Sequence, residues 1–221
     1  TSRTLNDPAS RVRSVELPNQ SANESTDDPS HVLESSHASF AVVDVETTGL
    51  RFDRDQILQI AVVLQDWTAH PTSVWSTYVR PSQFWSRDLG PQHVHGISRR
   101  KLIFAPTTAK AMQKFAQLTA GRILVAHNAE FDTKFLQTAA LENHVDLNWA
   151  GVLCTLQLSR KLDPQRQQTH KLSTLCEKYG IALHQAHHAE HDARATAELL
   201  PYLLTAHGIA DAESLQPFIR A

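Results

Sequence analysis

The chain has 221 residues, of which 41% are hydrophobic and 20% are charged. This composition is ordinary for a folded domain, and it excludes a wholly disordered chain, a collagen-like chain and a disulfide scaffold. The formal net charge of -2 excludes a strongly basic protein, so any contact with a polyanion must depend on a local group of cations.

The cysteine content and the hydropathy pattern bear on location. Cys154 and Cys176 have no other cysteine close by in the sequence, which indicates buried thiols in a reducing compartment. The chain contains no run of about 18 apolar residues, so we expect no transmembrane helix and no membrane partner. The N-terminus lacks the charged and apolar regions of a signal peptide, which favours a cytoplasmic location.

Residues 1–37 differ in composition from the rest of the chain. They are rich in Ser, Asn, Asp and Pro and show no apolar periodicity, which is typical of disordered segments. We therefore predict a disordered N-terminal tail over residues 1–37, a folded domain over residues 38–205, and a C-terminal helix or tail over residues 206–221.

Three strand patterns open the folded part. Residues 40–46 are β-branched and mostly apolar, as in a buried central strand, and residues 57–65 and 74–80 follow as further strands. Residues 70–73 are turn-forming types between the second and the third strand. Three strands joined by short connections predict an antiparallel meander.

Helix and strand patterns alternate in the second half of the chain. Strands are predicted over residues 122–128 and 151–156. Helices are predicted over residues 106–121, 130–144, 170–180 and 189–208, the last one bent or broken at Pro201. A meander followed by this alternation predicts an α/β fold, in which a mixed five-stranded sheet has helices on both faces.

Two carboxylates, Asp44 and Glu46, end the first predicted strand. Side chains alternate along a strand, so both acids point to one face while Val43 and Val45 point into the core. Two acids on one apolar strand disfavour each other's ionised form, and a divalent cation would remove this cost. The alternative is a solvated strand end, because so short a motif also occurs by chance. Asp211-Ala212-Glu213 repeats the spacing, and we assign that copy to helix-end chemistry.

Two further carboxylates stand near predicted helix starts. Asp132 is in the first turn of its helix, where the helix dipole alone favours an acid. Asp192 follows a histidine-rich segment and begins an Ala-rich helix. The histidines are His184, His187, His188 and His191. They form either a solvated loop or, by their i,i+4 spacing, a zinc site, although no HExxH motif or nearby cysteine supports zinc.

Five segments together resemble a known family. They are VVDVETTGL, the HGI of VHGIS, VAHNAEFDTKFL, the pair CTLQLSRKL and HKLSTLCEKYGI, and HHAEHDARATAELL, and they cover about residues 39–205. Their order and content resemble the DnaQ-like 3'-5' exonucleases of the DEDDh group, in the ribonuclease H-like superfamily. The chain is most similar to the epsilon proofreading subunit of bacterial DNA polymerase III and to the exonuclease domain of PolC-type polymerases.

The resemblance assigns roles to the acids and to one histidine. It implies that Asp44, Glu46, Asp132 and Asp192 hold two Mg2+ or Mn2+ ions, and that His187, five positions before the last acid, is the general base. Helical spacing alone would instead place His188 on the face of Asp192. The resemblance therefore requires that His187 lie in a loop before the helix begins.

The resemblance also implies contacts with the substrate. The predicted substrate-binding residues are Thr47, Thr48, Gly49, Leu50, His95, His127, Asn128 and Phe131. Gly49 would allow close approach of a nucleotide, Leu50 would wedge against a base, and Phe131 would stack or simply pack. Arg99, Arg100 and Lys101 either meet phosphates or form a solvated charge run.

The implied activity is hydrolysis of phosphodiester bonds from the 3' end of single-stranded DNA, with release of nucleoside 5'-monophosphates. A DNA polymerase or a repair complex is the implied protein partner. An exoribonuclease of the same family is the first alternative, and nothing in the sequence decides between DNA and RNA. A catalytically silent module that binds nucleic acid ends is the second.

Overall fold

The computed structural model describes residues 40–67, 71–86, 88–183 and 187–220. The predicted disordered tail over residues 1–37 lies outside the described residues, as does His184. Within the described ranges, no helix has both the length and the apolar character that a membrane crossing requires.

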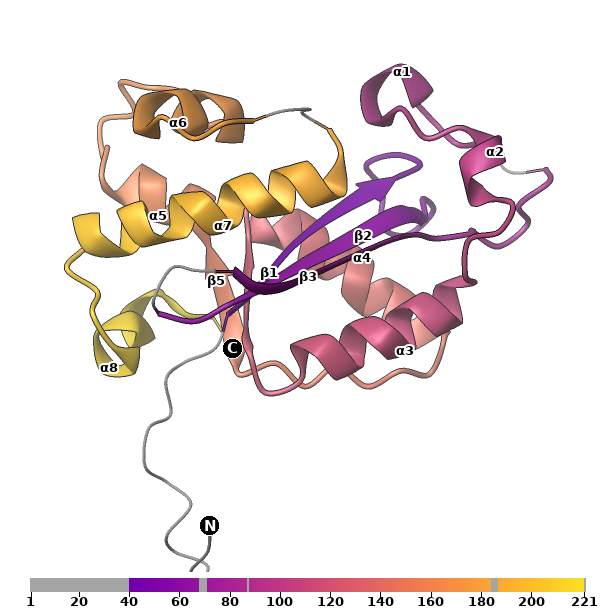
Figure 1. Ribbon diagram of the computed structural model, residues 1–221, viewed down its shortest axis with the longest axis horizontal. Coiled ribbons are helices and arrows are strands. Elements are labelled where there is room, and N and C mark those ends of the chain that lie inside the picture. The colour runs from indigo at the N-terminus through magenta and orange to yellow at the C-terminus, as the bar shows by residue number, and fades with distance from the viewer. Residues whose placement is uncertain (1–39, 68–70, 87, 184–186, 221) are drawn as a thin grey trace, which may run out of the picture. The chain divides into compact units, whose positions relative to one another are not determined.

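Five strands form one mixed sheet (Figure 1). They are β1 (Phe40–Thr47), β2 (Ile57–Gln65), β3 (Pro71–Tyr78), β4 (Ile123–Ala126) and β5 (Gly151–Cys154). Their order across the sheet is β3-β2-β1-β4-β5. The meander β1-β2-β3 is antiparallel, whereas β4 and β5 run parallel to β1. This topology confirms the predicted five-stranded mixed sheet and places β1 at its centre.

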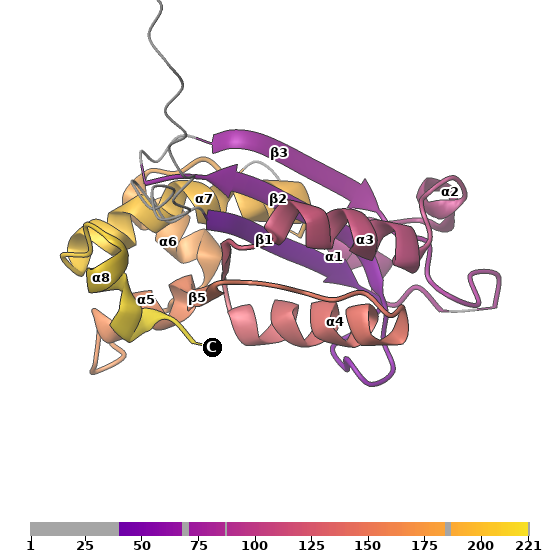
Figure 2. The same ribbon diagram turned by 90° about the horizontal axis from the view of Figure 1, so that it is seen from below.

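Helices cover both faces of the sheet, as predicted. The helices are α1 (Gln92–His95), α2 (Arg99–Leu102), α3 (Thr108–Thr119), α4 (Ala129–Glu142), α5 (Thr155–Lys161), α6 (Leu172–Tyr179), α7 (Ala189–Ala206) and α8 (Ala212–Leu215). Figures 1 and 2 show α5, α6 and α7 on one face and α3 and α4 on the other. The alternation of β1 explains both layers, because Phe40 and Val42 pack under α7 while Ala41 and Val43 pack against α3 and α4.

The turn predicted over residues 70–73 is wrong for its described part. Strand β3 already begins at Pro71, which pairs with Gln65, and the Thr72 hydroxyl donates to the carbonyl of Leu64 (3.1 Å). A proline is tolerated here because it is the first residue of an edge strand, where its missing N–H removes no ladder bond.

Of the bend or break predicted at Pro201, the break does not occur. Helix α7 runs as one helix through this proline. A proline inside a helix costs about 3 kcal/mol. Buried residues on both sides of it, Leu199, Leu200, Leu203 and Leu204, outweigh that cost by anchoring α7 on the sheet.

Two short elements near the site are absent from the predicted set. Helices α1 and α2 have four residues each, too few for a periodic pattern. The predicted strand 151–156 ends at Cys154, and Thr155 starts α5, so the second half of that segment is helical.

The C-terminal segment is a helix that closes one edge of the sheet. Asp211 caps α8 by accepting from the backbone N–H of Ser214 (2.8 Å), which confirms the assignment of this second acid pair to helix-end chemistry. The chain then returns so that Arg220 and Val152 exchange two backbone hydrogen bonds of 2.9 Å. This bridge covers β5, which would otherwise be an open edge strand.

Deletion of residues 206–221 is therefore expected to destabilise the domain. It removes Ile209 and Leu215, both buried in the core beneath α7, and it exposes the edge of β5. Two such side chains are worth about 3–5 kcal/mol of unfolding free energy. Urea denaturation would measure the loss. R220A is the matched control, since only backbone atoms of Arg220 make the bridge, and an equal loss in R220A would contradict this account.

Candidate active site

The end of β1 carries the first two acids because β1 is longer than its parallel neighbour. Strand β4 pairs only with residues 40–42, so the second half of β1 has no strand on that side. Asp44 and Glu46 lie on the face of β1 that α7 covers, while Val43 and Val45 are buried on the other face, against α3 and α4. A polar strand end beside a strand that stops early is where open α/β sheets place ligands.

Asp132 reaches the same strand from α4. Asn128, in a left-handed conformation (φ 66°), turns the chain from β4 into α4. The first turn of α4 then brings Asp132 under β1, where its Oδ1 accepts from the backbone N–H of Val45 at 3.2 Å. This acid is only 3% exposed, so it occupies a fixed place beside Asp44 rather than a solvated helix end.

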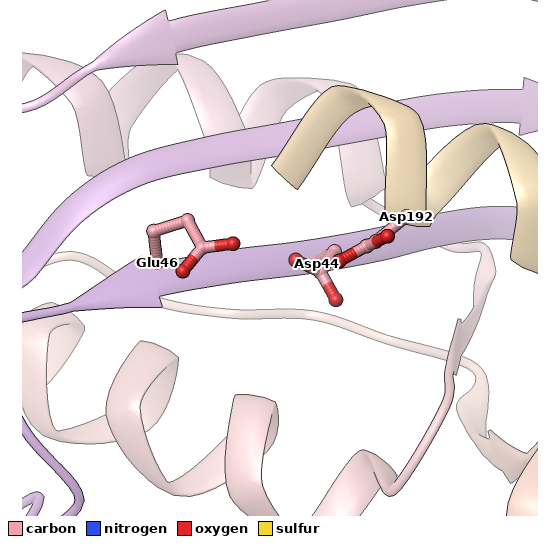
Figure 3. A group of neighbouring side chains, drawn as sticks. All are labelled: Asp44, Glu46 and Asp192. Carbon is pink, nitrogen blue, oxygen red and sulfur yellow. The ribbon is translucent and has the colours of Figure 1, made fainter. Parts of the chain in front are cut away.

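Asp192 completes the convergence from the first turn of α7. One carboxylate oxygen from each of Asp44, Glu46 and Asp192 lies within 4.8 Å of the other two. Figure 3 shows these three side chains. Asp132 lines the same cavity as these three. The structure thus brings together all four acids that the sequence predicts, from β1, α4 and α7.

The pKa values of all four carboxylates are raised above their ordinary values. Burial, followed by the charge of Asp192, raises the pKa of Glu46 to about 7. Burial raises the pKa of Asp132 to about 8. The pKa of Asp44 is raised well above its ordinary value by burial and then by the charges of the other three acids, and burial also raises the pKa of Asp192. The ionised cluster is therefore costly without a counter-charge.

The donor set fits divalent cations. Asp192 Oδ1 is buried and has no hydrogen-bond partner, while Oδ2 accepts from the backbone N–H of His187 (3.0 Å). A buried carboxylate oxygen without a hydrogen bond, near two other carboxylates, needs a cation as its partner. Hard oxygen donors without sulfur suit Mg2+ or Mn2+ better than zinc. Among the described residues, the three-carboxylate cluster is the single group that could hold a metal, and it contains no histidine.

His187 lies in the loop before α7, as the family resemblance requires. Helix α7 begins at Ala189 after His188, and His187 is exposed with a left-handed backbone (φ 65°). It lines the cavity of the four acids. The rings of His188 and His191 stack on each other, with centroids 4.6 Å apart, and the Nδ1 atoms of both are buried.

Most of the predicted substrate residues line one cavity with the acids. Its volume is about 430 Å³. The predicted residues in its wall are Thr47, Gly49, Leu50, His95, His127 and Phe131. The wall also contains Pro91 and Val94, which the sequence reasoning missed because they lie in and beside the short helix α1. The apolar members give this cavity the character of a site for a sugar and a base.

Thr48 and Asn128 do not line this cavity. The Thr48 hydroxyl is buried between Asp55 and the backbone N–H of Gln56, from which it accepts at 3.0 Å. Asn128 lines the neighbouring cavities. The fold itself requires glycine at position 49, since a Cβ there would collide with the Asp55 carboxylate.

Two histidines near the acids are tied into the protein. His127 contacts the Thr155 hydroxyl through Nδ1 and the His170 carbonyl through Nε2, both at 3.0 Å, and burial lowers its pKa to about 4. His95 Nε2 contacts the Leu89 carbonyl at 3.1 Å, its Nδ1 accepts from the Ile97 backbone N–H, and burial lowers its pKa. Both rings are therefore uncharged walls of the site at neutral pH.

The chain belongs to the exonuclease family, whose RNase_T model matches residues 41–200. The predicted membership in an exonuclease family, and with it the prediction of a nuclease enzyme, is thereby confirmed.

The chain is similar to one part of larger bacterial proteins. A DNA polymerase III PolC-type protein of Caldanaerobacter subterraneus subsp. tengcongensis is 34% identical over 169 residues, which cover 75% of this chain and 11% of that protein. The 3'-5' exonuclease DinG of Staphylococcus haemolyticus is 32% identical over 166 residues, 74% of this chain and 18% of that protein. The chain thus spans between about a tenth and a fifth of the length of these relatives.

Solved structures share the fold at low sequence identity. E. coli Exonuclease I in complex with a dT13 oligonucleotide has a TM-score of 0.67 and 19% identity, and the match covers 77% of this chain and 42% of that one. The nuclease domain of 3'hExo, a DEDDh family member bound to rAMP, has a TM-score of 0.67 and 16% identity, with 85% and 98% covered.

Proposed function

We propose that this chain is a metal-dependent 3'-5' exonuclease that removes nucleotides from the 3' end of single-stranded DNA and releases nucleoside 5'-monophosphates. The observation that carries this proposal is the convergence of Asp44, Glu46 and Asp192 within 4.8 Å, beside the buried Asp132 and the exposed His187. A phosphodiester placed in this cavity would meet every group that such a hydrolysis needs.

The four carboxylates would hold two divalent cations, Mg2+ or Mn2+. When bound, these cations supply a water of lowered pKa and stabilise negative charge on the attacking and leaving oxygens. The raised pKa values of the acids show that the ionised site needs positive charge, which bound cations would supply. Asp132 is anchored by the Val45 N–H, so it would position its ligand oxygen before any cation arrives.

His187 would take the proton from the attacking water. It is exposed and borders the cavity of the acids, so its ring can reach a solvent molecule there. The hydrogen bond from its backbone N–H to Asp192 fixes the loop against the acid cluster. The imidazole is the side chain best suited to accept a proton near neutral pH.

The terminal nucleoside would occupy the cavity of about 430 Å³. Leu50 and Phe131 offer apolar surface for the base, and the buried, uncharged His95 lies in the same wall. Neither the apolar surface nor the neutral ring distinguishes one base from another by charge. The site would therefore accept any terminal base, as trimming from an end requires.

DNA is the proposed substrate because the similar curated proteins include a DNA polymerase III PolC-type protein. RNA is the alternative, since the nuclease domain of 3'hExo was solved with rAMP. A silent end-binding module has no use for four costly carboxylates. A DNA polymerase or a repair complex stays the predicted partner, and the cytoplasm stays the predicted location.

A 5'-labelled oligonucleotide tests the proposal directly. With Mg2+ or Mn2+, the protein should shorten single-stranded DNA stepwise, and the released product should be the 5'-monophosphate. Matched DNA and RNA strands decide between the two substrates, because the 2'-OH is the group that differs. No shortening of either strand with either metal would refute the proposed activity.

Removal of divalent cations should make stability depend on pH. In the unfolded chain these acids lose their protons near pH 4, whereas in the folded chain Glu46 does so at about 7 and Asp132 at about 8. Between these values the folded state binds more protons, so the free energy of unfolding falls as the pH rises. Each unit between the folded and the unfolded pKa corresponds to about 1.4 kcal/mol, so we expect a loss of several kcal/mol between about pH 5 and pH 8, with the smaller share from the partly exposed Glu46.

Urea denaturation in a chelator at the two pH values would measure this loss. Addition of Mn2+ at the higher pH should restore stability, because the cations neutralise the ionised cluster. The E46Q variant in chelator should show a smaller loss than the wild type. Equal stability at both pH values in the metal-free wild type would contradict the raised pKa values.

A further inference from the structure

A second and larger cavity adjoins the one assigned to the terminal nucleoside. Its volume is about 980 Å³, against about 430 Å³ for the first. His127, His187 and Asp192 line both cavities, so the two meet at the acid cluster. A chain cleaved at that cluster therefore has space on both sides of the scissile phosphate.

The larger cavity is positively charged. Arg160, Arg166 and Lys171 line it, and Asp192, at its junction with the first cavity, is the single carboxylate among the described residues of its wall. Within the part of the chain that the structure describes, none of these three cations forms an ion pair. A concave surface lined by uncompensated cations favours an extended anion.

The cations stand on a loop that the protein holds in place. Asp163 anchors residues 162–171 between α5 and α6, because its Oδ2 accepts from the backbone N–H of Gln168 (3.0 Å) and lies 3.3 Å from His170 Nε2. The Asp163 carbonyl accepts from the backbone N–H of Arg166 (3.0 Å). His170 is in turn bonded to the Ser159 hydroxyl at 2.7 Å. The loop is therefore built to present Arg166 and Lys171, both exposed, at the cavity.

The charge of a nucleic acid strand is not symmetric about its last phosphodiester. On the 3' side of that bond lies one nucleoside without a further phosphate, whereas the 5' side carries one negative charge for each nucleotide. The described wall of the first cavity has apolar side chains and no Lys or Arg, so it suits the uncharged nucleoside, whereas the cationic cavity suits the charged side. The two cavities thus fix the direction in which a strand would lie.

We propose that the cavity lined by Arg160, Arg166 and Lys171 binds the phosphate backbone of the strand on the 5' side of the scissile bond. This inference rests on the proposed exonuclease function and adds to it a polarity and a requirement for a chain longer than one nucleotide. Among the described residues of its wall there is no Phe, Tyr or Trp, and the rings present are those of His127, His170 and His187, on which any base could stack. Binding would depend on charge and not on base identity.

Two substrates separate this inference from the proposed activity. The p-nitrophenyl ester of thymidine 5'-monophosphate carries no phosphate on the 5' side of its scissile bond, whereas a single-stranded oligonucleotide carries one for each further nucleotide. In R166A/K171A, we expect the ratio of kcat/KM for the oligonucleotide to kcat/KM for the ester to fall about tenfold. K110A/K114A removes the same charge from exposed positions on α3, across the sheet, and should keep the wild-type ratio.

Salt dependence gives a second measurement. Each phosphate contact to a single strand contributes about 0.7 to the slope of log affinity against log salt. Loss of two contacts should make that slope shallower by about 1.4 in R166A/K171A. If R166A/K171A matched K110A/K114A on both substrates, or lost equal activity on both, the inference would be overturned while the exonuclease function stood. If the wild type cleaved neither substrate, the proposed function would fail and this inference with it.

Discussion

The D44N variant should lose hydrolysis by about a thousandfold and yet unfold at a higher temperature than the wild type in chelator. Asp44 lies between Glu46, Asp132 and Asp192, and the charges of all three raise its pKa. Asparagine keeps the size of the side chain and removes the charge. The same substitution thus removes a metal ligand and relieves repulsion in the metal-free fold.

The opposite signs of the two effects are what make this prediction specific. A residue that served only packing would lose stability along with activity when changed. The protein should gain stability when a functional carboxylate that destabilises the fold is neutralised, since functional sites are often less stable than the fold allows. For a domain of this size, each kcal/mol regained raises Tm by about 2–4 °C.

Three measurements check D44N together: rate on a labelled oligonucleotide, Tm in chelator, and calorimetric titration with Mn2+. We expect weaker Mn2+ binding along with the slower rate. D146N is the matched control, because Asp146 is exposed in the connection between α4 and β5. Wild-type activity in D44N, or a lower Tm than the wild type in chelator, would show that Asp44 is not part of a metal-binding cluster.

The sheet and the first acid pair were predictable because the hydrophobic pattern of the strands and the residue types at the end of the first strand indicate the same arrangement. Residues 40–46 combine a buried apolar run with two acids that no core would keep without a reason. The prediction for Asp132 and Asp192 came from family resemblance, since each alone resembles an ordinary acid in a first helical turn. Only the fold shows that the early end of β4 opens the space in which they meet.

The details that sequence could not supply depend on contacts between distant residues. No local pattern indicates that His127 bonds Thr155 and His170, or that Thr48 turns toward Asp55. The hydroxyl of a threonine at the end of a strand can point toward the substrate cavity or into the protein, and the sequence does not indicate which. The roles of His127 and Thr48 in substrate binding stay predictions. Because their polar groups already bond within the protein, a substrate would contact the ring face of His127 and the backbone of Thr48.

Helical spacing alone did not favour His187 as the general base. Spacing on a helix favoured His188, while the family resemblance chose His187 and required it to precede α7. The structure places it there, with φ at 65°. A non-glycine residue in this conformation is uncommon, and such residues cluster at functional sites. The position of His187 is thus fixed by a backbone turn and not by helical periodicity.

This backbone conformation allows a sharp test of His187. Glycine adopts a positive φ more readily than histidine, so H187G should keep the loop and its hydrogen bond from residue 187 to Asp192. The variant then removes only the imidazole. Because general base catalysis contributes about 10²–10⁴-fold, we expect kcat to fall by that factor while Mn2+ binding is retained. Retained metal binding distinguishes His187 from Asp44.

Added imidazole should restore part of the lost rate in H187G, since residue 187 is exposed at the cavity and leaves open space for the free base. The matched control is H191N, which changes a neighbouring histidine whose ring stacks on His188. H191N should not respond to imidazole. If H187G kept its full rate, or if imidazole rescued H191N and not H187G, the base would be another residue. Rescue of H187G alone would assign proton transfer to the group that the left-handed turn presents.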